Sequence, residues 1–217
     1  MASDSPYPDH IGITDVTTRS HGQMVVEAFM EGQHSILADE PVGFDIGDPP
    51  DLRGQGKGWT PVHYQLAALS MCTSITIAVV ARDQGFVHKG LTTAIRSLID
   101  IRGFFFDLDL QPRFEQVSYD LTLDTKEGAA RIRALAEESD RRCPQLGLFH
   151  QAEVPMRIRW FRKGEKAPVY VQRFNLGRVE PEERLAAAKA RQVAAERAKA
   201  AKAAKGKPAR AARPKAR

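Results

Sequence analysis

The sequence predicts an α+β fold, because segments with strand-like alternation stand on both sides of two helical segments. Apolar and polar residues alternate over residues 117–123 and 156–160, which is the pattern of strands with one buried and one solvated face. Further strands are expected at residues 11–16, 24–30, 34–38, 92–101 and 169–174. A chain of 217 residues with this content fits one ordinary domain with an appendage.

The first helical segment has a clear start and a clear end. Thr60 is a favourable N-cap, Pro61 suits the first helical position, and Gly85 marks the end. The middle of the segment is apolar on all sides, so we expect surrounding protein to cover it. Residues 63–81 carry no Asp, Glu, Lys or Arg but include several polar side chains, so we interpret the run as a core helix and not as a bilayer span.

The second helical segment follows residue 125 and has apolar residues at helical spacing between 129 and 136. It should end at Cys143, because Pro144 cannot continue a helix. Each helix therefore carries one of the two cysteines, with Cys72 on the first.

The net charge of +5 is unevenly distributed along the chain. Residues 178–217 contain 13 Lys and Arg against 4 Asp and Glu, a balance of +9, which leaves −4 for residues 1–177. We expect a domain over residues 1–176 and a basic Ala/Lys-rich tail over 177–217, helical at about 181–204 and disordered beyond. The tail is either a solubilising extension or a segment that contacts nucleic-acid phosphates weakly and without sequence preference.

Several classes of protein are excluded by composition. Two cysteines cannot form a dense disulfide framework, and neither they nor the six histidines show metal-ligand spacing, so we expect no metal and no cofactor. The first nine residues contain acids and prolines where a signal peptide has a basic start and an apolar run. We therefore expect a cytoplasmic protein without membrane attachment.

Elementary chemistry leaves two interpretations of Cys72 open. A buried cysteine is usually a small inert hydrophobic residue. A nucleophilic cysteine needs a thiolate stabilised by a cation or a helix N-terminus, and a disulfide needs a second sulfur close by. Cys143 follows 71 residues later in the chain, and the spacing alone does not choose between these roles.

The residues around the two cysteines resemble the osmotically inducible protein C and organic hydroperoxide resistance family (OsmC/Ohr). The matching motifs, in chain order, are Asp39-Glu40-Pro41, a loop with Gly43 and Gly47, Thr60-Pro61, Ala67-Ala68-Leu69, Cys72-Thr73 and Cys143-Pro144. The resemblance covers about residues 11–162. It implies an OsmC-like fold, with antiparallel β-sheets wrapped around two long central helices in an intertwined homodimer.

The resemblance also implies a thiol-dependent peroxidase that protects against oxidative stress. Cys72 would attack an organic hydroperoxide and become a sulfenic acid, and Cys143 would resolve it to a disulfide. An external thiol or dithiol would then reduce the disulfide. An apolar pocket around the first helix suits alkyl or lipid hydroperoxides.

One departure from the family pattern bears on activity. The family's active peroxidases have a glutamate nine or ten residues before the first cysteine, where this chain has Val62 and His63. His63 is a candidate base, although nine helical residues put it on the opposite side of the helix from Cys72. The family's arginine comes from the N-terminal strands, where Arg19 is the nearest candidate and Arg53 a second. The alternative is an OsmC-like protein without peroxidase activity, whose apolar cleft binds a small hydrophobic ligand.

Overall fold

The computed structural model describes residues 16–21, 24–29, 32–44, 52–100, 104 and 112–176. Within these ranges the fold is α+β, as predicted, and contains two sheets. Strands β1 (Thr17–Ser20), β2 (Val26–Phe29) and β3 (Ile36–Ala38) form an antiparallel three-stranded sheet. Strands β4 (Leu91–Asp100), β5 (Arg113–Leu123), β6 (Met156–Arg162) and β7 (Tyr170–Phe174) form the second sheet in that order. Its pairs are antiparallel except for β5 and β6, which run parallel because α3 and α4 connect them, so this sheet is mixed and not antiparallel throughout as expected.

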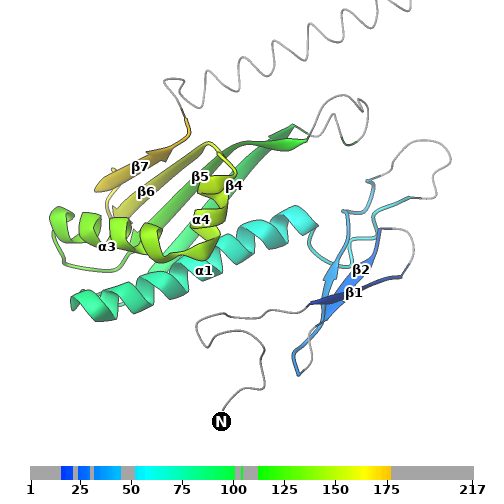
Figure 1. Ribbon diagram of the computed structural model, residues 1–217, viewed down its shortest axis with the longest axis horizontal. Coiled ribbons are helices and arrows are strands. Elements are labelled where there is room, and N and C mark those ends of the chain that lie inside the picture. Colours follow the sequence, from blue (N-terminus) through cyan, green and yellow to red (C-terminus); the bar gives the residue numbers. More distant parts are fainter. Residues whose placement is uncertain are drawn as a thin grey trace, which may run out of the picture.

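Three helices lie together against one face of the four-stranded sheet, namely α1 (Pro61–Gln84), α3 (Ala129–Arg142) and α4 (Pro144–Gln151) (Figure 1). The core forms where the alternating apolar positions of β5 and β6 meet the helices. Its side chains, each at most 2% exposed, include Leu69, Ile77, Val80, Tyr119, Leu121, Ile132, Leu135, Met156, Ile158 and Trp160. The period-two pattern therefore correctly predicted which face of the sheet is buried.

Helix α1 begins and ends where the sequence predicts. The Thr60 hydroxyl accepts the His63 backbone N–H at 3.4 Å, and Pro61 occupies the first turn. The helix ends at Gly85, whose φ of 59° is the left-handed conformation that glycine adopts most easily.

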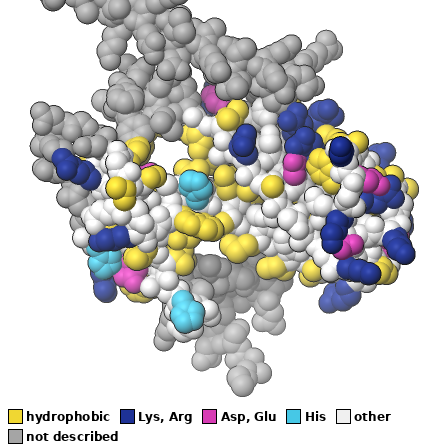
Figure 2. Space-filling model, turned by 180° about the vertical axis from the view of Figure 1, so that it is seen from behind, with side chains coloured by type: hydrophobic (Ala, Val, Ile, Leu, Met, Phe, Trp, Pro, Cys, Tyr) yellow, Lys and Arg dark blue, Asp and Glu magenta, His cyan; other side chains and the backbone are white. Residues whose placement is uncertain are grey.

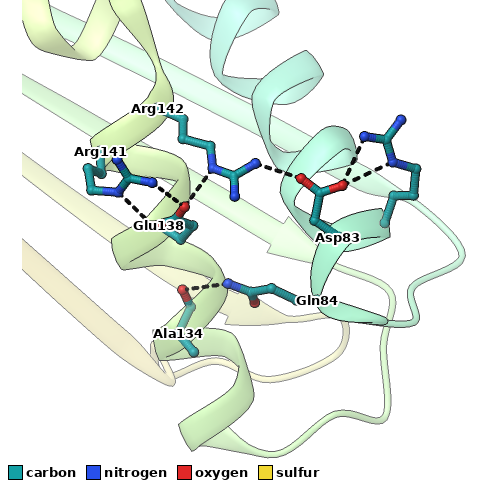
Figure 3. A network of polar contacts seen from close by, with 7 residues as sticks. Asp83, Gln84, Ala134, Glu138, Arg141 and Arg142 are labelled. Atoms are coloured by element: carbon teal, nitrogen blue, oxygen red, sulfur yellow. Dashed lines mark hydrogen bonds and ion pairs between the residues drawn. The ribbon is translucent and has the colours of Figure 1, made fainter.

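A salt-bridge network fixes the C-terminal end of α1 to α3 (Figure 3). The Arg142 guanidinium contacts Asp83 of α1 and Glu138 of α3, each at 2.6 Å. Arg141 also binds Glu138, and these two arginines lower the pKa of the Glu138 carboxyl to about 2. Because Arg142 immediately precedes Cys143, the network holds the second cysteine close to α1.

The three-stranded sheet lies beyond the N-terminal end of α1, away from the four-stranded sheet (Figure 1). Asp39, only 1% exposed, ties the following loop together by accepting the backbone N–H groups of Glu40, Gln55 and Lys57. The Tyr64 hydroxyl donates to the Leu37 carbonyl at 2.8 Å and links this sheet to α1. The sheet is thus attached to one end of α1.

Helix α1 is not covered on all sides within one chain, contrary to the expectation from its apolar middle. Met71 is 61% exposed and Ile75 is 67% exposed, and Val79 lies on the same face. By length and composition α1 could cross a membrane, with a mean hydropathy of 1.6 over its most apolar 18 residues, and a third of that window is buried in the protein. Its buried face belongs to the core, and its other apolar face has no described neighbour to cover it.

The other differences between the predicted and the observed elements concern short segments or segments at the ends of the domain. Helix α3 ends before Cys143, as the sequence predicts, but a further helix, α4, begins at once at Pro144. This helix was not predicted, because proline stops a preceding helix and is also favourable in the first turn of a new one. The sequence missed β1, a four-residue strand whose side chains are all exposed. The strand expected at 11–16 falls outside the described residues except for Val16, and the tail from residue 177 lies outside them entirely.

Candidate functional site

The structure brings the two cysteines together. Cys72 lies about three turns into α1 and is half-buried, whereas Cys143 is 2% exposed at the junction of α3 and α4. Both are free thiols, and their sulfur atoms are 3.6 Å apart. A disulfide bond needs about 2.05 Å, so a shift of about 1.5 Å would join them.

The Cys72 sulfur lies at the N-terminus of helix α4. Burial raises the pKa of the Cys72 thiol, and the backbone N–H of Gln145, which donates to the sulfur, acts in the opposite direction. The contact with Cys143 also raises that pKa. Pro144 has no N–H, so Gln145 supplies the first amide of this helix. In a single chain the net effect favours the protonated thiol.

A threonine hydroxyl contacts the buried Cys143 sulfur. The Thr73 hydroxyl oxygen is 3.6 Å from Cys143 Sγ, and its O–H donates to the Leu69 carbonyl at 2.8 Å. The Tyr119 hydroxyl donates to the Ser70 carbonyl at 3.4 Å, and burial raises the pKa of Tyr119. Since the Thr73 hydrogen is used within α1, its oxygen is an alternative acceptor for the Cys143 S–H, which also lies within reach of Cys72 Sγ.

The other predicted site residues lie elsewhere in the chain. His63 is exposed, and its Nδ1 is 2.7 Å from the Thr60 hydroxyl at the start of α1. Nine residues of helix separate it from Cys72, about 13.5 Å along the axis. Arg19 is exposed on β1, where its guanidinium lies 5.5 Å from the centre of the Phe29 ring. Arg53 is exposed in the loop before α1.

An apolar groove opens beside the N-terminal half of α1. Its volume is about 650 Å³, and its lining includes Val42, Trp59, His63, Leu66 and Ile95. Cys72 is not part of this lining, so the groove and the thiol pair are separate features of the chain. In the part of the chain that the structure describes, no three His, Cys, Asp or Glu side chains are grouped as metal ligands.

Sequence reasoning missed three contributors to the cysteine pair. Thr73 belongs to the Cys72-Thr73 motif, but the motif does not indicate its contact with Cys143. Tyr119 was visible only as an alternating apolar position in a strand, and Gln145 acts through its backbone. These contacts depend on how α1, α4 and β5 pack against each other.

The fold and the cysteine geometry together define the class of this protein. It is an α+β protein in which a cysteine on a long helix, α1, faces a second cysteine at the junction of α3 and α4. Residues 54–159 match the family model described as OsmC-like protein. These residues therefore form a domain of the OsmC/Ohr family. None of the curated proteins matches the chain by sequence.

Solved structures with the same fold come from several bacteria. An OsmC-like protein from Mycoplasma pneumoniae superposes with a TM-score of 0.56 at 15% identity, covering 70% of this chain and 97% of that one. An organic hydroperoxide resistance protein OsmC from Legionella pneumophila gives a TM-score of 0.50 at 14% identity, with coverages of 70% and 98%. One from Elizabethkingia anophelis gives 0.50 at 12% identity, with coverages of 71% and 99%. At these identities the likeness concerns the fold.

Proposed function

We propose that the protein is a thiol-dependent peroxidase that reduces organic hydroperoxides, with Cys72 as the peroxidatic residue and Cys143 as the resolving residue. The observation that carries the proposal is the 3.6 Å separation of the two sulfur atoms, in a domain of the OsmC/Ohr family. Two of the similar structures are described as organic hydroperoxide resistance proteins, which agrees with this activity. Cys72 is half-buried and Cys143 is 2% exposed, so Cys72 is the more accessible of the two cysteines, as the peroxidatic residue must be.

The reaction proceeds in two steps on the protein. The Cys72 thiolate attacks the terminal oxygen of the hydroperoxide, the O–O bond breaks, and the alkoxide takes a proton to leave as an alcohol. Cys72 is then a sulfenic acid. The Cys143 sulfur attacks Cys72 Sγ, and the sulfenic hydroxyl leaves as water with the proton of Cys143. An external thiol or dithiol reduces the resulting disulfide and supplies the two electrons of the cycle.

We propose that the active form is an intertwined homodimer. In one chain burial leaves the pKa of Cys72 raised, so the thiolate needs a further cation. The exposed apolar face of α1, with Met71 and Ile75, and the separate three-stranded sheet are the surfaces that a second copy would cover. Figure 2 shows hydrophobic side chains gathered in the middle of one face of the molecule, between regions rich in Lys and Arg. In such a dimer His63 or Arg19 of one copy would act on Cys72 of the other.

A second candidate function is binding of a small hydrophobic ligand without peroxidase activity. It is favoured by the 650 Å³ apolar groove and by Val62 and His63 at the positions of the family's glutamate. In this case the two cysteines would contribute to packing and would not react with peroxide. The two functions differ in whether peroxide consumes the thiols.

The test is a thiol titration after addition of one equivalent of cumene hydroperoxide to the reduced protein. The peroxidase proposal expects loss of two thiols per chain and a Cys72–Cys143 disulfide in a peptide map. Cys72→Ser should lose all reactivity, whereas Cys143→Ser should still form a Cys72 sulfenic acid that dimedone traps. An unchanged thiol titre in the wild-type protein would leave ligand binding as the better account.

We also propose that the protein acts in the cytoplasm, where thiol reductants keep both cysteines reduced. The OsmC-like domain would extend over residues 1–176, and residues 177–217 would form a separate basic tail with weak, nonspecific affinity for nucleic acid. Equal retardation of nucleic acid at low salt by the full chain and by a chain truncated before Arg178 would exclude that role of the tail.

A further inference from the structure

A row of polar and basic side chains crosses the four-stranded sheet on the face turned away from the helices. The strand register places Arg96 of β4 beside Ser118 of β5, Ser118 beside Arg157 of β6, and Arg157 beside Arg173 of β7. Side chains alternate between the two faces of a strand, and Val117 and Tyr119 on either side of Ser118 are in the core. Arg96 and Arg173 are exposed, while Ser118 and Arg157 are half-buried.

The positive charge of this row is not neutralised by any side chain that the structure describes. Arg157 and Arg173 are direct partners on antiparallel strands, where like charges destabilise a sheet. The adjacent row shows the usual solution, because Asp120 binds the Arg159 guanidinium at 2.5 and 2.6 Å. By contrast, the side chains of Arg96, Arg157 and Arg173 form no hydrogen bond or ion pair with any residue that the structure describes.

Two polar groups in this row have a hydrogen-bond donor that no described residue uses. Arg157 Nε is shielded from solvent and has no hydrogen-bond partner, which ordinarily indicates that a partner is missing. The Ser118 hydroxyl oxygen accepts the Gln116 side-chain N–H at 3.0 Å, so its own hydrogen remains free to donate. The row thus offers three guanidinium groups and one hydroxyl donor, with no acidic side chain aligned among them.

We propose that Arg96, Ser118, Arg157 and Arg173 form a binding site for a phosphate group. Guanidinium groups bind phosphate oxygens in pairs of parallel hydrogen bonds, and several of them suit a doubly charged anion. The phosphate would come either from a small phosphorylated molecule or from a nucleic-acid backbone. This site lies on the opposite face of the sheet from the cysteine pair and does not depend on the proposed peroxidase activity.

A structural role and a binding role of these arginines have opposite effects on the stability of the unliganded protein. If the arginines stabilise the fold, their removal should destabilise the protein. If they serve to bind a ligand, removal of two like charges that face each other should leave the unliganded protein as stable as before, or more stable. The bound phosphate should raise the unfolding temperature of the wild-type protein and not that of a variant that lacks these arginines.

The experiment compares the full-length wild-type protein with the double variant Arg157→Gln/Arg173→Gln. The control is Lys126→Gln/Lys166→Gln, which removes the same charge from two exposed side chains outside the row. Calorimetric titration and thermal unfolding are measured with pyrophosphate and with a short single-stranded DNA. The basic tail is present in all three proteins, so its contribution cancels in the comparison.

We expect at least about a tenfold loss of affinity in the double variant and none in the control. Binding of pyrophosphate would identify a small ligand, and binding of DNA alone would identify a nucleic-acid backbone. Equal affinity of the double variant and the wild-type protein would overturn the proposal, as would absence of binding by both probes. A lower unfolding temperature of the unliganded double variant would show instead that the row is structural.

Discussion

Replacement of Thr73 by valine tests the role of the buried hydroxyl beside the resolving cysteine. Valine has nearly the same shape as threonine, so the substitution removes the 3.6 Å contact with Cys143 Sγ without opening a cavity. The Leu69 carbonyl loses only the additional bond from the Thr73 hydroxyl. The reaction that should respond is attack of Cys143 on an oxidised Cys72.

The size of the effect follows from the contact that is lost. A buried hydrogen bond contributes about 1 kcal/mol net, and the long contact to sulfur is not expected to exceed this. If the hydroxyl holds Cys143 in the attacking orientation, its loss should slow disulfide closure about fivefold, since 1.4 kcal/mol corresponds to a factor of ten. The unfolding free energy should fall by about the same 1 kcal/mol.

The assay forms the mixed disulfide of glutathione with Cys72, the more accessible thiol, and follows glutathione release by rapid quench and mass spectrometry. This reaction does not need peroxidase activity, so it isolates the role of Cys143. Ser74→Ala is the matched control, because the Ser74 hydroxyl donates to the Ser70 carbonyl at 2.8 Å within the same helix. Closure at the wild-type rate in Thr73→Val, or equal slowing in both variants, would refute the reasoning.

Three further predictions follow from the site and the fold. Burial raises the pKa of the Cys72 thiol in one chain, so in Cys143→Ser the alkylation rate with iodoacetamide should level off at a higher pH in samples diluted to monomers than in the dimer, where a partner cation acts on Cys72, and identical pH profiles at the two concentrations would contradict the role of the partner. Asp39→Ala should lower the unfolding free energy by about 2–3 kcal/mol in urea denaturation, because three backbone N–H groups lose their acceptor, whereas Asp39→Asn should cost less. The Glu138 carboxylate has a folded pKa of about 2 against 4.5, so its stabilisation is complete above pH 4.5 and is lost as the pH falls toward 2. As the pH falls from 4.5 toward 2, the urea midpoint of Glu138→Gln should therefore decrease less than that of the wild-type protein. Identical urea midpoints of the two proteins at pH 6 would contradict a stabilising role of the network.

Much of the candidate site could be predicted from local sequence. Pro61 and Gly85 marked both ends of α1, and the alternation around Tyr119 identified the buried face of β5. The resemblance to the OsmC/Ohr family singled out Cys72 and Cys143 and their order in the chain. Local signals of this kind are reliable because helix caps, proline and period-two alternation act within a few residues.

Contacts between distant segments could not be predicted in the same way. The pattern of α1 was apolar all round, and only the structure shows that Met71 and Ile75 remain uncovered within one chain. Helix α4 was missed because Pro144 was interpreted only as a terminator, although proline also begins helices. The position of the Gln145 amide at the Cys72 sulfur follows from that helix.

The sequence by itself determined the α+β class, the bounds of the long helix, the inward face of the central strands and the two cysteines as the residues of interest. These properties depend on local periodicity and capping, which each segment carries on its own. Only the tertiary structure decided that the two sulfur atoms, 71 residues apart in the chain, lie 3.6 Å from each other and beside Thr73. It also aligned Arg96, Arg157 and Arg173 in one row, because strand register is set by packing of the whole core. No single segment contains that information.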